Sequence, residues 1–149
     1  MNALALPELT WKEKVAFVGA HIEANFPAVE TPVKHIFEPG MYIREITIPA
    51  GVVFVGRPHR FGHRVRFLQG RVRLIDESGS REVEPPFEFF TKPGFLMVLE
   101  TYEPHMGRTY HPNPDGCRDV ELMEGLIFHS KDEVRQIGRT VQNALQGPT

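Results

Sequence analysis

The chain has 149 residues, enough for one domain with its own core, and its formal net charge of −2 comes from 17 basic and 19 acidic side chains. This balance, and the lack of a long basic block, argue against a nucleic-acid-binding protein. The single cysteine excludes an intramolecular disulfide and fits a reducing compartment. No apolar run approaches the roughly 20 residues of a membrane span. The first ten residues lack the features of a signal peptide, so we expect no membrane contact and no secretion by that route.

A helix is predicted at each end of the chain. Thr10 and Glu13 have the spacing of a capping box, and apolar residues recur behind them at helical intervals up to about Asn25. Ser130 and Glu133 repeat this pattern before a second apolar stripe that continues to about residue 145. We therefore expect an N-terminal helix and arm over 1–34 and a C-terminal helix over 130–149.

The region 35–129 between these helices has the pattern of a β-domain. Short apolar or alternating segments are separated by Gly- and Pro-containing turns, which is typical of an all-β sandwich or barrel. The predicted strands lie at 41–48, 52–55, 63–68, 71–75, 81–83, 87–90, 96–102, 108–111 and 120–128.

A regular spacing runs through the middle of this domain, from Gly51 through Arg57, His59 and His63 to Gly70. In an extended strand the three polar side chains would point to the same face. The spacing resembles the first motif of the cupin superfamily, G-x5-H-x-H-x3-E-x6-G. The resemblance implies an all-β protein: a single cupin-like jelly-roll β-barrel with flanking N- and C-terminal α-helices.

The cupin resemblance also implies a set of metal ligands, and this chain departs from it. Arg57 stands where the first histidine is expected and His63 where the glutamate is expected, while His59 is retained. In the second motif Met97 stands where one further histidine is expected. A guanidinium only donates hydrogen bonds and cannot coordinate a metal, whereas an imidazole can.

A metal site could be completed by a histidine from another strand. His59, His63 and His111 would form a three-histidine site suited to a divalent transition metal such as Zn, Fe, Mn or Ni. His105 is expected in a turn at the mouth of the barrel. The first expectation for cofactors is nevertheless none, because so few of the usual ligands are retained.

Two other interpretations of the same residues stay open. The histidines could be hydrogen-bonded polar side chains at the barrel entrance. Alternatively, Arg57 and Arg60 could join them in contacting an anion or an acidic partner, because neighbouring cations disfavour a metal ion.

A narrower resemblance covers residues 45–112. The segment ITIPAG at 46–51, the H-x3-H spacing, the turn at 92–94 and the sequence Tyr-His-Pro at 110–112 are similar to small cupin-like proteins encoded by tailed bacteriophages. This likeness implies a phage context, so we expect the protein in the host cytoplasm or the virion.

The leading functional prediction is a non-catalytic cupin-fold protein. We expect a virion-associated decoration, collar or connector subunit, forming a homo-oligomer and contacting other virion proteins. The alternative is a metal-dependent cupin enzyme, an oxygenase, isomerase or lyase, that acts on a small molecule through the three histidines. No catalytic residue is assigned in either case.

Overall fold

The computed structural model describes residues 9–146, which divide into two compact units. The barrel unit is Val29–Phe128, and the helical unit combines residues 9–28 with residues 129–146. The backbone N–H of Thr47 donates to the carbonyl oxygen of Pro32 at 3.1 Å, which ties the segment before the first strand to the barrel unit.

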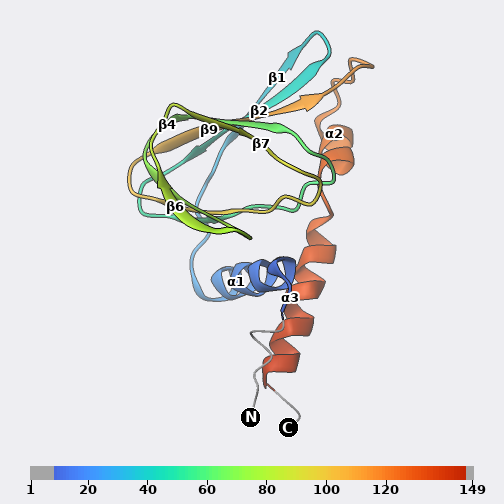
Figure 1. The fold of residues 1–149 in the computed structure, drawn as a ribbon. Helices are drawn as coiled ribbons and strands as arrows, with labels where there is room; N and C mark the ends of the chain where they lie inside the picture. Colours follow the sequence, from blue (N-terminus) through green and yellow to red (C-terminus); the bar gives the residue numbers. More distant parts are fainter. Residues whose placement is uncertain (1–8, 147–149) are drawn as a thin grey trace. The chain divides into compact units, whose positions relative to one another are not determined.

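The barrel unit is built from two antiparallel sheets, which face each other in Figure 1. One sheet has the strand order β1-β2-β9-β4-β7 and the other β3-β8-β5-β6. The strands are β1 (Val33–Glu38), β2 (Met41–Ile48), β3 (Val53–Val55), β4 (Arg64–Gln69), β5 (Val72–Asp76), β6 (Gly79–Val83), β7 (Phe87–Phe90), β8 (Val98–Thr101) and β9 (His105–Pro112). This architecture confirms the predicted jelly-roll barrel with flanking helices.

The alternation of buried and outward-facing side chains along the strands determines which residues form the barrel core. In β4, Val65 and Phe67 are buried while Arg64 and Arg66 face outward, as the predicted period of two requires. The inward side chains of both sheets form one apolar cluster: Ile48, Val65, Phe67, Val72, Leu74, Val83 and Leu99. This cluster fills the middle of the barrel and leaves its ends to polar or capping residues.

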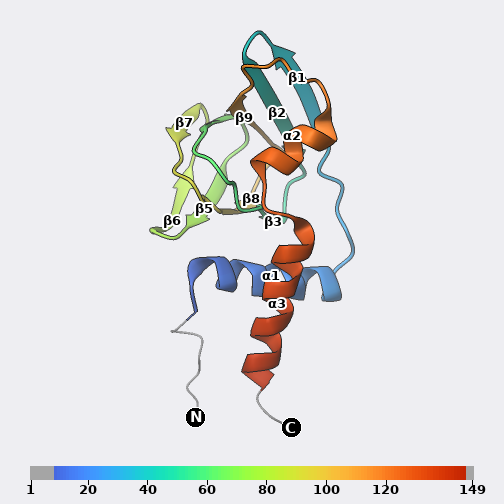
Figure 2. The same ribbon diagram turned by 90° about the vertical axis from the view of Figure 1, so that its right-hand side faces the viewer.

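The predicted strand at 120–128 is wrong, because this segment forms helix α2 (Val120–Ile127). The Asp119 side chain accepts a hydrogen bond from the backbone N–H of Leu122 and caps the helix. Met123 and Ile127 lie one turn apart, so both can pack on the buried ring of Tyr42. Figure 2 shows α2 at one end of the barrel, beside β1 and β2.

Strand β1 was not predicted from the sequence. It pairs antiparallel with β2 from Val33 opposite Ile46 to Glu38 opposite Met41, and a tight turn at Gly40 (φ 73°) joins the two strands. The alternation in β1 is weak because its residues are mostly half-buried at the edge of the sheet.

The helical unit contains α1 (Trp11–Asn25) and α3 (Lys131–Gln146). The predicted capping box of α1 is confirmed, with the hydroxyl of Thr10 and the carboxylate of Glu13 each accepting a backbone N–H. The Ser130 hydroxyl accepts the backbone N–H of Glu133 at the start of α3.

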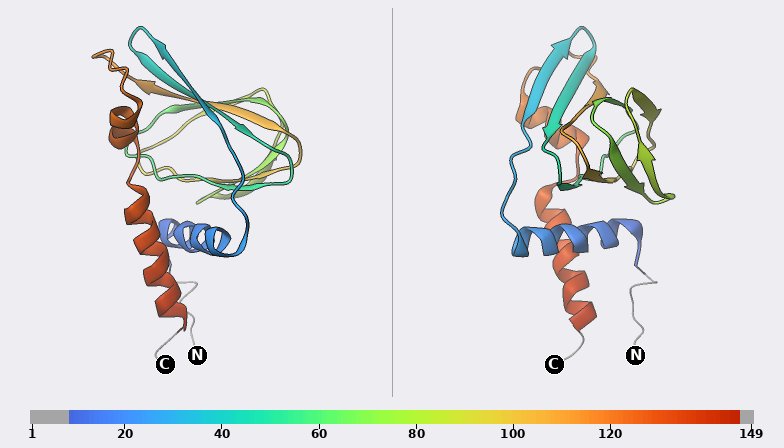
Figure 3. Two further views of the ribbon diagram at one scale, coloured as in Figure 1. Left: turned by 180° about the vertical axis from the view of Figure 1, so that it is seen from behind. Right: turned by 90° about the vertical axis from the view of Figure 1, so that its left-hand side faces the viewer.

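The two helices cross, as the views in Figure 3 show. Gly138 of α3 lies so close to α1 that an added Cβ would be 2.7 Å from the carbonyl oxygen of Ala16. The pair is therefore in backbone contact at this point. Within residues 9–146 no helix combines the length and the apolar character needed to cross a lipid bilayer.

Candidate functional site

The structure brings the three predicted histidines together inside the barrel unit. His63 directly precedes β4, His111 lies near the end of β9, and the antiparallel pairing of Arg64 with Tyr110 makes these two histidines neighbours. Their ring centroids are 5.0 Å apart, and the ring of His59 lies 4.1 Å from that of His63 and 5.8 Å from that of His111. Three imidazoles therefore share one end of the barrel interior, which is called the mouth below.

The backbone reaches this arrangement by a different route from the one predicted. β3 ends at Val55 and β4 begins at Arg64, so the intervening segment is a loop and not a strand that aligns its side chains on one face. Pro58 and Gly62 interrupt the strand. The loop is held by its backbone, with the N–H of His59 donating to the carbonyl of Phe95 at 3.2 Å.

Two of the three imidazoles are fixed by hydrogen bonds. Nδ1 of His63 lies 3.2 Å from the carbonyl oxygen of Phe61, and a hydrogen bond to this oxygen is formed in the tautomer with the proton on Nδ1. The Thr91 hydroxyl lies 3.0 Å from the same Nδ1. Nε2 of His111 lies 2.8 Å from the hydroxyl of Thr109. Each ring therefore has one nitrogen anchored and the other left for a ligand.

His59 is held less firmly than the other two. Both of its ring nitrogens are shielded from solvent, and neither forms a hydrogen bond of normal geometry in the described part of the chain; only a weak interaction with the backbone of Arg57 acts on the ring. A buried polar atom without a partner costs about 1–3 kcal/mol, so a group that supplied one would stabilise this site.

The environment keeps the imidazoles neutral. Burial lowers the pKa of His59 to about 2, and the nearby His63, His111 and Arg44 act in the same direction, weakly opposed by the backbone of Arg57. Burial lowers the pKa of His111 to about 3, again assisted by His63 and Arg44. The pKa of His63 is lowered by burial and raised by its bond to the Phe61 carbonyl. Neutral imidazole is the form that coordinates metals.

Helix α2 and the residue after it close the mouth above these rings. The ring of Phe128 contacts His59 edge-on, with 4.6 Å between centroids, and the guanidinium carbons of Arg44 and Arg57 lie 4.7 and 4.4 Å from its centroid. Nη2 of Arg44 donates to the carboxylate of Glu124 at 2.8 Å. Nε of the exposed Arg60 donates to the carbonyl of Phe128 at 2.9 Å, so Arg60 anchors the end of α2.

The mouth also contains Arg44, Glu124 and Phe128, which were not predicted from the sequence. A signal for Arg44 was present, because it alternates with the buried Tyr42 and must share its face. Its partner on α2 was hidden by the incorrect strand prediction at 120–128.

The donor chemistry of the mouth suits a transition metal, although the rings stack on one another. Among residues 9–146 no three His, Cys, Asp or Glu side chains are arranged to hold a metal ion. The ring planes of His59 and His63 are only 26° apart, which is a stacking geometry. Met97, at the position expected for a further cupin ligand, packs against the apolar core. The observation in favour of a metal is the set of three neutral imidazoles, one of which has both nitrogens buried and unsatisfied.

The prediction that His105 lies in a turn at the mouth is wrong. It is the first residue of β9, is 1% exposed, and lies at the opposite end of that strand from His111. Its Nδ1 donates to the carbonyl of Gly70 at 3.1 Å, and its ring meets the edge of Phe67. The alternation of β9 turns it inward, so it belongs to the barrel interior and not to the three-histidine cluster.

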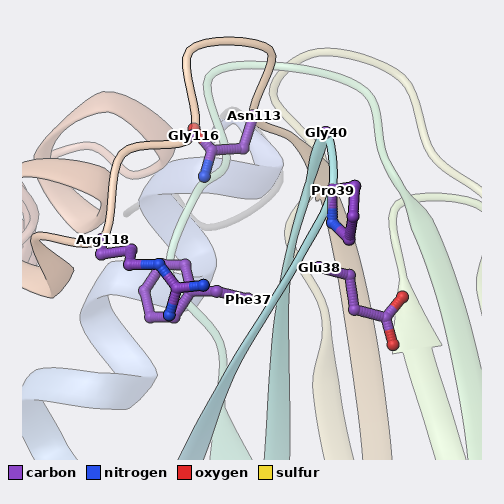
Figure 4. A pocket seen from close by; sticks show the side chains of 7 residues that line it. All are labelled: Phe37, Glu38, Pro39, Gly40, Asn113, Gly116 and Arg118. Atoms are coloured by element: carbon purple, nitrogen blue, oxygen red, sulfur yellow. The ribbon is translucent and has the colours of Figure 1, made fainter.

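A separate cavity of about 260 Å³ lies at the tip of the β1–β2 hairpin (Figure 4). The guanidinium of Arg118 lies over the ring of Phe37 at 5.7 Å and forms one wall. Its lining residues are Phe37, Glu38, Pro39, Gly40, Asn113, Gly116 and Arg118. Ligand sites usually measure about 300–1,000 Å³, and this cavity contains none of the clustered histidines.

No protein-family model matches this chain, and neither does any curated protein sequence. Solved structures do resemble it. A DMSP lyase, DddQ of Ruegeria pomeroyi DSS-3, aligns with a TM-score of 0.50 and 16% identity over 58% of this chain and 49% of its own. A variant of salicylate 1,2-dioxygenase from Pseudoaminobacter salicylatoxidans aligns with a TM-score of 0.52 and 11% identity over 85% of this chain and 40% of its own.

A third structure extends the likeness to a smaller protein. The uncharacterised double-stranded β-helix protein from Klebsiella pneumoniae aligns with a TM-score of 0.50 and 11% identity, over 61% of this chain and 84% of its own. The present chain spans about half of the lyase and two fifths of the dioxygenase. At these identities the likeness concerns the fold. The chain has the cupin fold, the double-stranded β-helix that its sequence predicted.

Proposed function

We propose that this chain is a metal-dependent cupin that binds a divalent transition metal through His59, His63 and His111 and acts on a small molecule at the mouth of the barrel. The observation that carries the proposal is His59, whose two buried nitrogens form no hydrogen bond of normal geometry among the described residues. A metal ion would satisfy one of them.

The surrounding residues support this proposal. The Phe61 carbonyl favours the tautomer of His63 with the proton on Nδ1, and Thr109 holds Nε2 of His111, which is how residues next to a metal site orient its ligands. When bound, a divalent metal would supply Lewis acidity and hold a substrate oxygen. Phe128 would exclude water from the rings below it. The names of the lyase and the dioxygenase that share the fold describe enzymes that act on small molecules.

Cobalt titration tests the metal site. The full chain, stripped with EDTA, is titrated with Co²⁺ and the visible absorption of the bound ion is followed. We expect one equivalent to bind, with roughly 100-fold weaker binding in His111→Ala and about 10–100-fold weaker binding in Thr109→Val. His21→Ala, which removes an exposed histidine of α1, is the matched control. Binding that is unchanged in His111→Ala would refute the site.

A second candidate is the interaction protein predicted first from the sequence, and exposed aromatic side chains favour it. Phe61 and Phe90 are 63% and 75% exposed. The residues that follow them, Gly62 and Thr91, are in backbone contact, because an added Cβ on Gly62 would lie 2.6 Å from the carbonyl oxygen of Thr91. Exposed apolar patches are typical of protein–protein contacts, and a second copy of the chain would bury this one.

Light scattering of the purified chain tests this second candidate. A homo-oligomer that dissociates in Phe90→Lys, but not in Val53→Lys on the edge of the other sheet, would support it. A monomeric wild-type protein would refute it. The narrower prediction of a bacteriophage subunit is tested separately, by mass spectrometry of purified virions.

A further inference from the structure

Arg44 lies at the centre of the mouth. It is on the inward face of β2, where it pairs with Thr109 of β9. The next pair on the same face, two residues along each strand, is Tyr42 with His111. Its side chain is only 16% exposed. A guanidinium in this position stands beside the proposed metal site and under the closing helix.

Arg44 hydrogen-bonds both Glu124 and the Tyr42 side chain, and its Nε is left without a partner among the described residues. Nη2 donates to one carboxylate oxygen of Glu124 at 2.8 Å, while Nε is shielded from solvent and has no hydrogen-bond partner in the described part of the chain. A guanidinium binds a carboxylate best through two parallel N–H groups, and Glu124 engages it at one. A ligand carboxylate that bonds both Nη2 and Nε would therefore form one more hydrogen bond with Arg44 than Glu124 forms.

A ligand carboxylate could displace the Glu124 carboxylate from Arg44. It comes from α2 and not from a barrel strand, and its side chain is 31% exposed. The apolar wall beside it is Phe128, which Arg57 contacts from 4.4 Å. The pKa of Arg57 is lowered by burial, raised by Glu124 and lowered by Arg44, so these three charges interact across the mouth.

We infer that the mouth binds the carboxylate group of a small organic acid on Arg44, in the place that Glu124 occupies. Glu124 is then an internal carboxylate that competes with the ligand. This inference rests on the proposed function, because it names the substrate class of the same site. An acid held on Arg44 would lie against the three histidines, with Phe128 as its cover.

Calorimetry on the metal-free protein tests the carboxylate site. Propionate is titrated into the EDTA-treated full chain, and propionamide serves as its neutral isostere. Removing the competing carboxylate in Glu124→Ala should lower the dissociation constant for propionate at least about 10-fold relative to wild type. Glu121→Ala, an exposed carboxylate of the same helix, should behave like wild type. Propionamide should bind none of them.

Other outcomes would overturn the inference. It fails if Glu124→Ala does not bind propionate, if propionamide binds equally well, or if the double variant Arg44→Met with Glu124→Ala binds as tightly as Glu124→Ala. Glu124→Gln, which keeps the shape and one oxygen acceptor, repeats the measurement should the alanine variant unfold. In wild type, propionate but not propionamide should raise the unfolding temperature, and equal shifts would also refute the inference.

The cobalt titration separates this inference from the proposed function. A protein that binds Co²⁺ but not propionate refutes the carboxylate site alone. A protein that binds propionate on Arg44 but no Co²⁺ refutes the metal site alone.

Discussion

Acid should destabilise the metal-free protein through the neutral histidines of the mouth. The folded-state pKa values of His59 and His111 are about 2 and about 3, lowered from 6.5. In the unfolded chain both rings take up protons once the pH falls below about 6.5. Between these limits the unfolded state binds more protons, so the free energy of unfolding must fall as the pH falls.

The size of the effect follows from the two shifts. Each histidine contributes about 1.4 kcal/mol per pH unit, so acidification from about pH 6.5 to pH 5 removes about 2 kcal/mol per ring and about 4 kcal/mol for both. The pKa of His63 is also lowered and adds to the loss in the same direction. Small domains are stable by only about 5–15 kcal/mol, so the change is a large part of the total.

Urea unfolding followed by circular dichroism measures this dependence, with EDTA present throughout. His59→Phe keeps an aromatic ring between His63 and Phe128 but removes one ionisable group. The loss of stability between neutral pH and about pH 5 should therefore shrink by about 2 kcal/mol. His21→Phe, on an exposed face of α1, should leave it unchanged. Equal pH dependence in His59→Phe and wild type would refute the assignment of neutral, buried imidazoles.

Two further predictions concern packing. Met123→Ala leaves a cavity beneath α2, against Tyr42, and should lower the free energy of unfolding at neutral pH by about 2–5 kcal/mol in urea titrations. Gly138→Val should lower the thermal unfolding temperature, because its Cβ would lie 2.7 Å from the carbonyl oxygen of Ala16. Gly125→Ala is the matched control: it meets nothing within 4 Å inside α2, and alanine there should stabilise by about 0.5–1 kcal/mol.

The fold could be predicted because most strands carry a period-two pattern bounded by glycines. The predicted bounds 41–48 and 87–90 are those of β2 and β7, and the other observed strands except the unpredicted β1 lie within a few residues of their predictions. The helix α2 was missed since its short apolar run has no periodicity that separates a strand from a buried helix. Asp119, a helix-capping residue directly before the run, was the signal that could have decided it.

The sequence predicted which histidines come together at the mouth, but not the charged residues beside them. The spacing of His59 and His63 located the mouth, although a loop and not a strand brings their rings together. Glu124 meets Arg44 only after α2 folds back over the barrel, a contact across 80 positions of the chain. Such a pairing leaves no local pattern in the sequence.

The two ends of β9 differ in how the barrel is closed beside them, which favours the mouth for the proposed site. Both His105 and His111 are buried by the same alternation, so the strand itself does not distinguish them. At the His105 end the backbone segments approach closely, because an added Cβ on Gly70 would collide with the carbonyl oxygen of Pro104. At the His111 end the closure consists of side chains from α2 and Phe128, held by the ion pair of Arg44 with Glu124, by apolar contacts and by the hydrogen bonds of Arg60 to the end of the helix. Chemistry is therefore expected where side chains, and not backbone, seal the barrel.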